Sequence, residues 1–433
     1  MVSELSRDSD LRAVQRAREL MRRHDECHGN RGRRSTASGR VRMPNTRRVF
    51  AAVMGVCLFA GGCTTATHAE APKPVRPAST SEPSLALDLT PGPKANNVAP
   101  GKPITVDAEY GELTKVTLIG ADGTVVKGSL NDDSTAWRAG EKLGFGKTYT
   151  LTARGVGDDG ERVVERSRFT TATPAQTVSV WPAVVDGATV GVGMPVSLQF
   201  SAPIKNKDAA ERALRVTSKP QTKGAFHWFS DEWVVWRPKE HWKPRTKVSI
   251  DAEVYGRHFG NGVYGAQDVS TDMKIGKRVV AVANGKTHRM NVWINGNKVK
   301  RMPISMGKPT HPTPHGTYTV MSEHHDYTMD SSTYGVPVNA DEGYKITVTH
   351  ATRLSYSGIF YHSAPWSVGD QGHRNVSHGC INLSAPDAAW MMNHSKPGDL
   401  FRVTKSGGQR LEPTDGFSVW QMPWRKWRTG GVH

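Results

Sequence analysis

The chain has 433 residues, which is too many for one ordinary domain, so we expect two to four domains. Its formal net charge is +17, of which residues 1–63 contribute +7 through 13 Lys and Arg against 6 Asp and Glu, and the remainder +10. The basic residues form no long block and accompany no helix-turn-helix, zinc-finger or RNA-binding signature, which argues against a nucleic-acid partner. The charge favours anionic polymers such as cell-wall glycans, teichoic acids or lipid headgroups.

The N-terminal region has the order of an export signal. Arg47 and Arg48 precede an apolar stretch, 49–60, and the small residues Gly61 and Gly62 follow it directly before Cys63. About a dozen apolar residues are too few for a permanent membrane helix, which needs roughly 20.

The arrangement resembles a bacterial lipoprotein signal over 43–63, with Cys63 as the lipidated first residue of the mature protein. A plain cleaved signal peptide is the alternative. Met43 opens this signal, so we interpret residues 1–42 as a non-native or disordered extension. We expect an exported protein that is lipid-anchored to the outer face of the plasma membrane and faces the cell wall.

Residues 64–84 are rich in Pro and Ala and predict a semi-extended tether. Short alternating segments separated by turn signals then predict β-sandwiches rather than alternating strands and helices. Examples of these segments are 104–108, 149–153 and 196–200.

This region also repeats internally. Trp137-Arg138 recurs as Trp236-Arg237, a shift of 99 positions, and a Gly-Lys-Pro start at Gly101 is answered by Gly-Met-Pro at Gly193. The extra residues fall around 205–214, where we predict a short inserted helix. The pattern predicts two tandem immunoglobulin-like domains, 85–174 and 175–276, whose tryptophans we interpret as core residues.

A third, strand-rich domain is predicted over 277–405. The expected strands are 278–283, 290–294, 317–321, 345–349, 358–362 and 399–403. One helix is well signalled, because Ser384 and Asp387 form a capping box around Pro386 and the pattern stops at Pro397.

The tail, 406–433, contains Trp420, Trp424 and Trp427, and we expect it to pack back on the domains and seal a junction. The predicted fold class is therefore mostly β, with two immunoglobulin-like β-sandwiches followed by a β-rich domain with one or two short helices.

Cys380 is the only cysteine after residue 63, so it is either a buried thiol or a nucleophile. His378 is two residues away and points to the same side of an extended segment, and His362 lies eighteen residues upstream. A free thiol is only a few per cent ionised at neutral pH, and we expect a histidine to lower its pKa by forming an ion pair. The amides of Gly379 and Cys380 are candidate donors to an oxyanion.

His362, fourteen intervening residues and then Ser377-His378-Gly379-Cys380-Ile381-Asn382 resemble the signature of the L,D-transpeptidase (YkuD-type) catalytic domain. The string 329–339 resembles the lid region of mycobacterial members, as does 362–369. Those members are lipoprotein-like or membrane-anchored and carry two immunoglobulin-like domains, so the resemblance covers the whole mature chain.

The resemblance implies that Cys380 attacks the third stem residue, diaminopimelate, of a peptidoglycan tetrapeptide and releases the terminal D-Ala. The acyl-enzyme then reacts with the side-chain amine of another diaminopimelate, which cross-links two stems. His362 is the implied general base, oriented by the backbone carbonyl of Ser363. His378 either takes part in proton transfer or only orients the loop.

Further residues are implied to contact the substrate or the oxyanion. They are Tyr344, Gly379 and Cys380 at the oxyanion, and Met329, Tyr334, Trp366, Ser377, His378 and Asn382 around the substrate. No metal or organic cofactor is implied, and carbapenem β-lactams are the implied inhibitors.

Three other readings remain. An L,D-carboxypeptidase would give the same acyl-enzyme to water, and a catalytically idle protein would only bind the cell wall. A sortase-like ligase needs an Arg after the cysteine, and the nearest, Arg402, lies late in an expected strand. Five further histidines lie in expected loops without consistent ligand spacing, so we interpret them as solvated rather than metal-binding. They are His311, His315, His324, His325 and His373.

Overall fold

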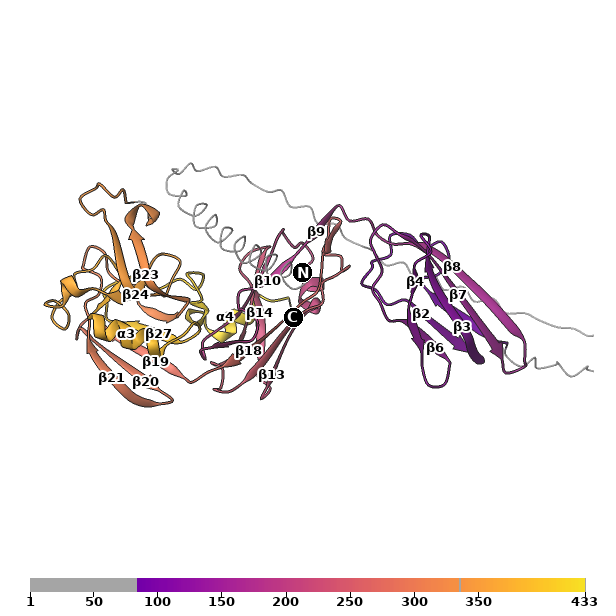
Figure 1. The fold of residues 1–433 in the computed structure, drawn as a ribbon, viewed down its shortest axis with the longest axis horizontal. Coiled ribbons are helices and arrows are strands. Elements are labelled where there is room, and N and C mark those ends of the chain that lie inside the picture. The colour runs from indigo at the N-terminus through magenta and orange to yellow at the C-terminus, as the bar shows by residue number, and fades with distance from the viewer. Residues whose placement is uncertain (1–83, 335, 433) are drawn as a thin grey trace, which may run out of the picture. The chain divides into compact units, whose positions relative to one another are not determined.

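The computed structural model describes residues 84–334 and 336–432 (Figure 1). The expected lipidation site, Cys63, and the expected signal and extension lie outside these residues. Within the described ranges, no helix is both long and apolar enough to cross a membrane.

The first module is a sandwich of two four-stranded antiparallel sheets, ordered β1-β2-β6-β5 and β4-β3-β7-β8. Its strands are β1 (Ala86–Thr90), β2 (Thr105–Glu109), β3 (Gly111–Gly120), β4 (Val125–Val126), β5 (Gly128–Leu130), β6 (Ala136–Ala139), β7 (Thr148–Gly157) and β8 (Arg162–Thr170). Alternating side chains of β7 point inward, and Leu118, Leu151 and Phe169 are buried between the sheets.

The second module has the same two-layer plan, with sheets ordered β10-β12-β15-β14 and β11-β18-β16-β13 and a short parallel pair, β17-β9. Its elements are β9 (Gln176–Val178), β10 (Val180–Pro182), β11 (Ala188–Val190), β12 (Val196–Phe200), α2 (Lys207–Ala213), β13 (Leu214–Lys219), β14 (Gly224–Trp228), β15 (Trp233–Pro238), β16 (Lys247–Ala252), β17 (Val263–Gly265) and β18 (Val269–Ile275). The helix α2 lies where the extra residues predicted it, and Asn206 caps its N-terminus by accepting from Ala209 N.

The repeated tryptophan occupies the same place in both modules. In the first module Trp137 of β6 lies opposite Val106 of the neighbouring strand β2. In the second module Trp236 of β15 lies opposite Val196 of β12. Each indole lies so close to a neighbouring-strand glycine, Gly128 or Gly224, that a Cβ there would approach it to 2.1 or 2.0 Å. Both tryptophans are buried, so their interpretation as core residues is confirmed.

The third domain contains two sheets around a shared core. The five-stranded sheet has the order β21-β20-β19-β27-β22, and the four-stranded sheet has the order β23-β24-β25-β26. Its elements are β19 (Val279–Asn284), β20 (Arg289–Ile294), β21 (Asn297–Pro303), β22 (Gly316–Thr319), β23 (Ser322–Asp330), the 3-10 helix η1 (Ser331–Tyr334), β24 (Lys345–Arg353), β25 (Phe360–Ser363), the 3-10 helix η2 (Pro365–Ser367), β26 (Ile381–Leu383), α3 (Ala385–His394) and β27 (Leu400–Thr404). In α3, Ser384 accepts from Asp387 N, as the capping box predicts.

One prediction about this domain is wrong. His324 and His325 were expected in loops but lie in β23, because this polar segment pairs along most of its length with β24. Long-range pairing therefore overrides the weak strand signal of a segment rich in His and Asp.

The tail packs against the second module, with the 3-10 helix η3 (Val419–Gln421) and α4 (Trp424–Arg428). Arg237 donates to Met422 O at 2.8 Å, and Trp427 Nε1 donates to Ala225 O at 2.9 Å. Trp420 Nε1 donates to Gly193 O at 2.8 Å. The expected packing of the tail on a domain is thus present.

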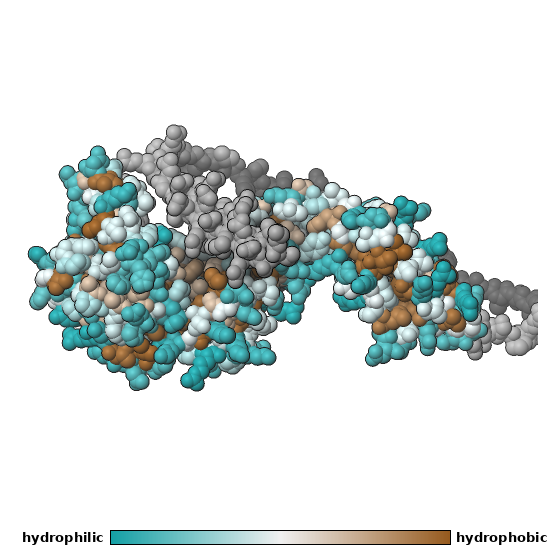
Figure 2. Space-filling model, in the orientation of Figure 1, coloured by the Kyte–Doolittle hydropathy of each residue, from teal (hydrophilic) through white to brown (hydrophobic). Residues whose placement is uncertain are grey.

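The surface visible in Figure 2 is mostly hydrophilic or neutral, with apolar residues gathered in small brown areas. On the first module the exposed apolar side chains include Ile119, Val125 and Val164. Ile119 and Val125 are register partners on β3 and β4 and lie side by side, whereas Val164 lies on β8.

Candidate active site

The site is built on two neighbouring parallel strands. In the register of β25 and β26, His362 lies opposite Asn382, and Cys380 immediately precedes β26. Residues two apart on an extended segment share a face, so Cys380 and Asn382 lie on the same face as His362. His362 and Asn382, twenty positions apart in the sequence, become neighbours through this pairing.

His362 is 3% exposed and hydrogen-bonded through its Nδ1, which donates to Ser363 O at 2.9 Å. A neutral imidazole that donates from Nδ1 carries its lone pair on Nε2. Burial lowers the pKa of His362, and the hydrogen bond to Ser363 only partly offsets this effect. The ring is therefore held neutral, with one nitrogen able to accept a proton.

The Cys380 thiol is half-buried and donates to Gly358 O at 3.5 Å. It packs against a cluster that includes Met329, Phe360 and Tyr344. Burial raises the pKa of this thiol to about 11. Burial of both groups thus favours a neutral thiol and a neutral imidazole, and the expected thiolate–imidazolium ion pair stays a prediction.

The loop 377–380, which we call the nucleophile loop after the expected role of Cys380, has a backbone that is fixed from within. Gly379 has a φ of +131°, a conformation that side chains disfavour. Ser377 Oγ accepts from Gly379 N at 3.1 Å and donates to Cys380 O at 2.6 Å. The Ser377 hydroxyl is therefore hydrogen-bonded within the loop and engages one of the two expected oxyanion donors, while its predicted substrate contact stays a prediction.

The amide of Cys380 is the remaining donor, since no acceptor among the described residues is paired with it. Tyr344 lies close by in the same cluster as the thiol. The arrangement leaves one backbone N–H beside the sulfur, where charge would develop on an attacked carbonyl.

Thr313 holds the loop from outside and was missed by the sequence analysis. Its side chain is fully buried, accepts from Gly307 N at 3.0 Å and donates to Gly379 O at 2.7 Å. A threonine in a turn between prolines gives no sequence signal for a partner sixty-six residues away.

Asn382 was predicted to line the substrate pocket, and in the structure it makes a supporting contact. Its side chain is buried, and Nδ2 donates to Ser367 Oγ at 3.0 Å. Ser367 in turn donates to Ala364 O at 3.1 Å, and Gln371 donates to the same carbonyl. Asn382 therefore ties the segment after His362 to β26, and acts on the site through that segment.

The other expected substrate residues surround the thiol at different depths. Met329 is buried in the cluster against which Cys380 packs, whereas Trp366 is 58% exposed, with its ring centroid 6.1 Å from that of His362. Ser331 and Tyr344 exchange hydrogen bonds, Ser331 N to Tyr344 O and Tyr344 N to Ser331 Oγ, both at 2.9 Å. Tyr334 ends η1, and its side chain lies outside the described part of the structure.

Comparisons with known proteins point to one family. The L,D-transpeptidase catalytic domain matches residues 278–404, and a bacterial Ig domain matches residues 95–258. L,D-transpeptidase 2 of Mycobacterium tuberculosis (strain CDC 1551 / Oshkosh) is 42% identical over 350 residues, which cover 81% of this chain and 85% of that protein.

The chain belongs to the L,D-transpeptidase family.

L,D-transpeptidase 5 of Mycobacterium tuberculosis (strain ATCC 25618 / H37Rv) is 36% identical over 353 residues, covering 80% of this chain and 76% of that protein. The solved structure of the L,D-transpeptidase LdtMt1 in complex with imipenem is 37% identical, with a TM-score of 0.47, over 54% of this chain and all of that one. The predicted family and the mostly β fold, with immunoglobulin-like sequence before a YkuD catalytic domain, are confirmed.

In this L,D-transpeptidase, His378 is exposed and faces the loop 336–344, which we call the lid loop. Its Nε2 donates to a carboxylate oxygen of Glu342, and the same oxygen accepts from Lys308 Nζ at 2.6 Å. Glu342 and Lys308 were missed, because isolated charged residues in loops resemble any solvated surface.

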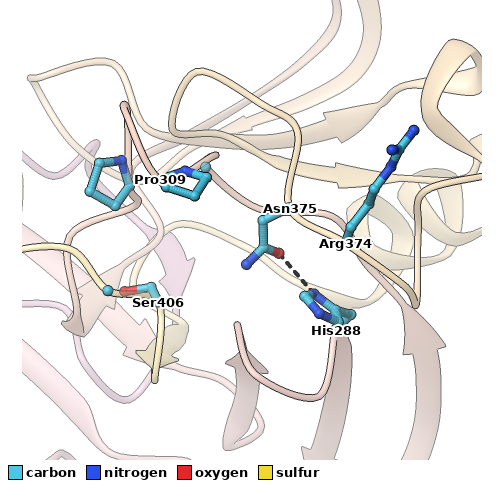
Figure 3. A pocket seen from close by; sticks show the side chains of 8 residues that line it. His288, Pro309, Arg374, Asn375 and Ser406 are labelled. Atoms are coloured by element: carbon cyan, nitrogen blue, oxygen red, sulfur yellow. Dashed lines mark hydrogen bonds between the residues drawn. The ribbon is translucent and has the colours of Figure 1, made fainter.

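A cavity of about 440 Å³ lies behind the nucleophile loop of the transpeptidase (Figure 3). It is lined by His288, Gly307, Pro309, Pro312, Arg374, Asn375, Ser406 and Gly407. Asn375 Oδ1 accepts from His288 Nδ1 and Met306 N, both at 3.0 Å, while Arg374 extends away from this pair. Asn375 thereby fastens the segment that leads into Ser377.

Proposed function

We propose that this L,D-transpeptidase cross-links peptidoglycan stems through a Cys380 acyl-enzyme. The donor is a tetrapeptide stem that loses its terminal D-Ala, and the acceptor is the side-chain amine of diaminopimelate in a second stem. The observation that carries the proposal is the hydrogen bond from His362 Nδ1 to Ser363 O, which leaves Nε2 as a base on the face that Cys380 shares.

In the first half-reaction, Cys380 Sγ attacks the carbonyl carbon between diaminopimelate and D-Ala, and its proton passes to His362 Nε2. The C–N bond then breaks, His362 returns the proton to the departing D-Ala amine, and a thioester remains. Burial raises the pKa of the thiol and so favours a neutral resting thiol, for which proton removal accompanies attack instead of preceding it.

In the second half-reaction, the acceptor amine attacks the thioester carbonyl and gives a proton to His362. The C–S bond breaks, and the sulfur regains that proton as the new amide forms. The backbone amide of Cys380, together with the residue Tyr344, stabilises the oxyanion in both steps. No oxidant, metal or organic cofactor is needed for the atoms and electrons to balance.

Carbapenems are proposed to acylate the same thiol, because they present a strained amide to it. The proposal draws on the 37% identical transpeptidase solved in complex with imipenem. Met329 and the partly exposed Trp366 are proposed to line the channel that both inhibitor and donor stem enter.

Export and anchoring through Cys63 are proposed from the order of charged, apolar and small residues over 43–63. A lipid anchor on the outer face of the plasma membrane would bring the enzyme to its polymeric substrate. Mass spectrometry of the mature N-terminus tests this, since lipidation requires a diacylglyceryl mass on Cys63 that Cys63→Ser lacks.

Incubation with a disaccharide-tetrapeptide, followed by mass spectrometry, tests the reaction. We expect a cross-linked dimer that has lost one D-Ala, and neither dimer nor imipenem adduct with Cys380→Ala. Tripeptide without dimer would overturn transpeptidation in favour of L,D-carboxypeptidase activity. An adduct formed by Cys380→Ala at the wild-type rate would overturn the nucleophile assignment.

A further inference from the structure

Glu342 joins three segments that surround the nucleophile. It belongs to the lid loop, and its Oε2 accepts from His378 of the nucleophile loop and from Lys308 Nζ. The backbone amide of Lys308 donates to Ser377 O at 2.8 Å. One carboxylate oxygen therefore connects the lid loop with the nucleophile loop and with the segment that pairs with it.

The ring of His378 also contacts two other rings, both in a tilted orientation. Its centroid lies 5.5 Å from that of Tyr344 and 5.2 Å from that of His311. The titratable groups that face His378 are therefore Glu342 and Tyr344 from the lid side and His311 from the 307–315 segment. Among these, Glu342 is the one that forms an ion pair with Lys308.

Glu342 remains ionised over the physiological range. Hydrogen bonds from Lys308 and then from His378 lower the pKa of this carboxyl to about 2. The side chain of Glu342 is 46% exposed, so the attraction is partly screened by water and weakens further with salt. The contact is suited to bias a loop between positions without locking it.

We propose that Glu342 is a positioning residue that acts through His378, fixing the nucleophile loop and holding the lid loop beside Cys380 so that the donor stem enters an ordered channel. The inference rests on the proposed function, because it concerns the same donor site. It adds a carboxylate that none of the sequence motifs identified.

The test compares Glu342→Gln with Asp341→Asn in the full chain. Both changes remove one negative charge from the lid loop, but Asp341 has no ion pair among the described residues. With the tetrapeptide donor, Glu342→Gln should lower kcat/KM by about fivefold, mainly through a higher KM, which is the scale of one exposed ion pair. Asp341→Asn should stay within about twofold of wild type, and Glu342→Ala should lose at least as much as Glu342→Gln.

Ionic strength separates positioning from general charge effects. The difference in kcat/KM between Asp341→Asn and Glu342→Gln should narrow as salt rises from about 0.05 to about 0.5 M, because salt screens exposed charges over this range. A difference independent of salt would contradict an ion-pair contribution.

Hydrogen exchange supplies a readout that does not depend on activity. Glu342→Gln should accelerate exchange in both 336–345 and 374–381, whereas Asp341→Asn should leave the second segment unchanged. If both variants match wild type in kcat/KM and in exchange of 374–381, the inference is overturned. If wild type itself forms no acyl-enzyme with the donor, the proposed function fails instead.

Discussion

The imidazole of His362 is oriented by its own neighbour, because Nδ1 donates to Ser363 O across a single residue. Such a bond needs no distant partner, so the sequence motif carries most of the information for it. The placement of this histidine beside the segment of Cys380 differs, since it depends on the parallel register of β25 and β26, in which His362 lies opposite Asn382.

The first prediction concerns pH. Burial lowers the pKa of His362, so its base form should persist below the ordinary pKa of about 6.5, and kcat/KM should fall only at more acidic pH. Burial raises the pKa of the thiol to about 11, so the plot of kcat/KM against pH should show no second ionisation between about pH 7 and about pH 9. Imipenem acylation rates measured across pH test both the fall at acidic pH and the flat region above it.

The variant His378→Asn serves as the control for this profile. It should retain the position of the acid limb, because His362 is the proposed base. The ordinary pKa of histidine is about 6.5. An acid limb centred above this pH of about 6.5, or one that disappears in His378→Asn, would contradict the assignment of His362.

A second prediction concerns Thr313. Replacing it with Val removes the hydroxyl that satisfies Gly307 N and Gly379 O, and leaving buried polar groups unpaired costs ~1–3 kcal/mol. We expect kcat/KM to fall about tenfold, since the loop before Cys380 loses its external support. Thr313→Ser keeps the hydroxyl and should restore most activity, and equal rates for the two variants would count against this role.

At the scale of elements, the sequence predicts strand positions well where apolar residues alternate. The segment 196–200 is β12 without any shift, and the capping box around Ser384 begins α3 as expected. The polar segment β23 was missed, because its strand conformation depends on pairing with β24. The hydrogen-bond partners of Ser377 and Asn382 were not predicted, since the folded structure sets them.

Asp399, just before β27, provides the third prediction. Its side chain is buried, one oxygen has no hydrogen-bond partner, and burial raises the pKa of the carboxyl to about 7. The folded state thus binds more protons than the unfolded state between the ordinary carboxyl pKa and about 7, so this group lowers stability as pH rises through that window.

The change Asp399→Asn should therefore raise Tm at pH 8 by about 5 °C and have a smaller effect at pH 5, as measured by calorimetry. The exposed Asp107→Asn is a charge-matched control that should leave Tm nearly constant at both pH values. A gain in Tm that is equal at both pH values would contradict the burial of a titrating carboxyl.

At the scale of the whole molecule, the arginines of the repeated Trp-Arg pair lie in different environments. Arg138 is exposed, whereas Arg237 is buried and lies 4.6 to 5.4 Å from the ring centroids of Trp420, Trp424 and Trp427. The sequence predicts the repeat but not this difference, because only the second arginine is covered by the distant tail.

The fourth prediction follows from this docking. Trp427 is fully buried and stacks on His227 with a centroid distance of 4.8 Å, so Trp427→Ala should destabilise the second module by ~3–5 kcal/mol. Trp424→Ala, in the same helix but only partly buried, should cost less. Denaturant unfolding measures both, and equal losses would contradict the central place of Trp427.

The cluster around Arg237 also allows docking of the tail to be followed by tryptophan fluorescence. Three of the 12 tryptophans of the chain lie within it, each close to a guanidinium group. Release of the tail would transfer these indoles from a largely dry, cationic environment into water and so change the colour and intensity of their emission. Intrinsic fluorescence therefore follows the attachment of the tail to the second module without any added dye, in the same sample in which catalysis is measured.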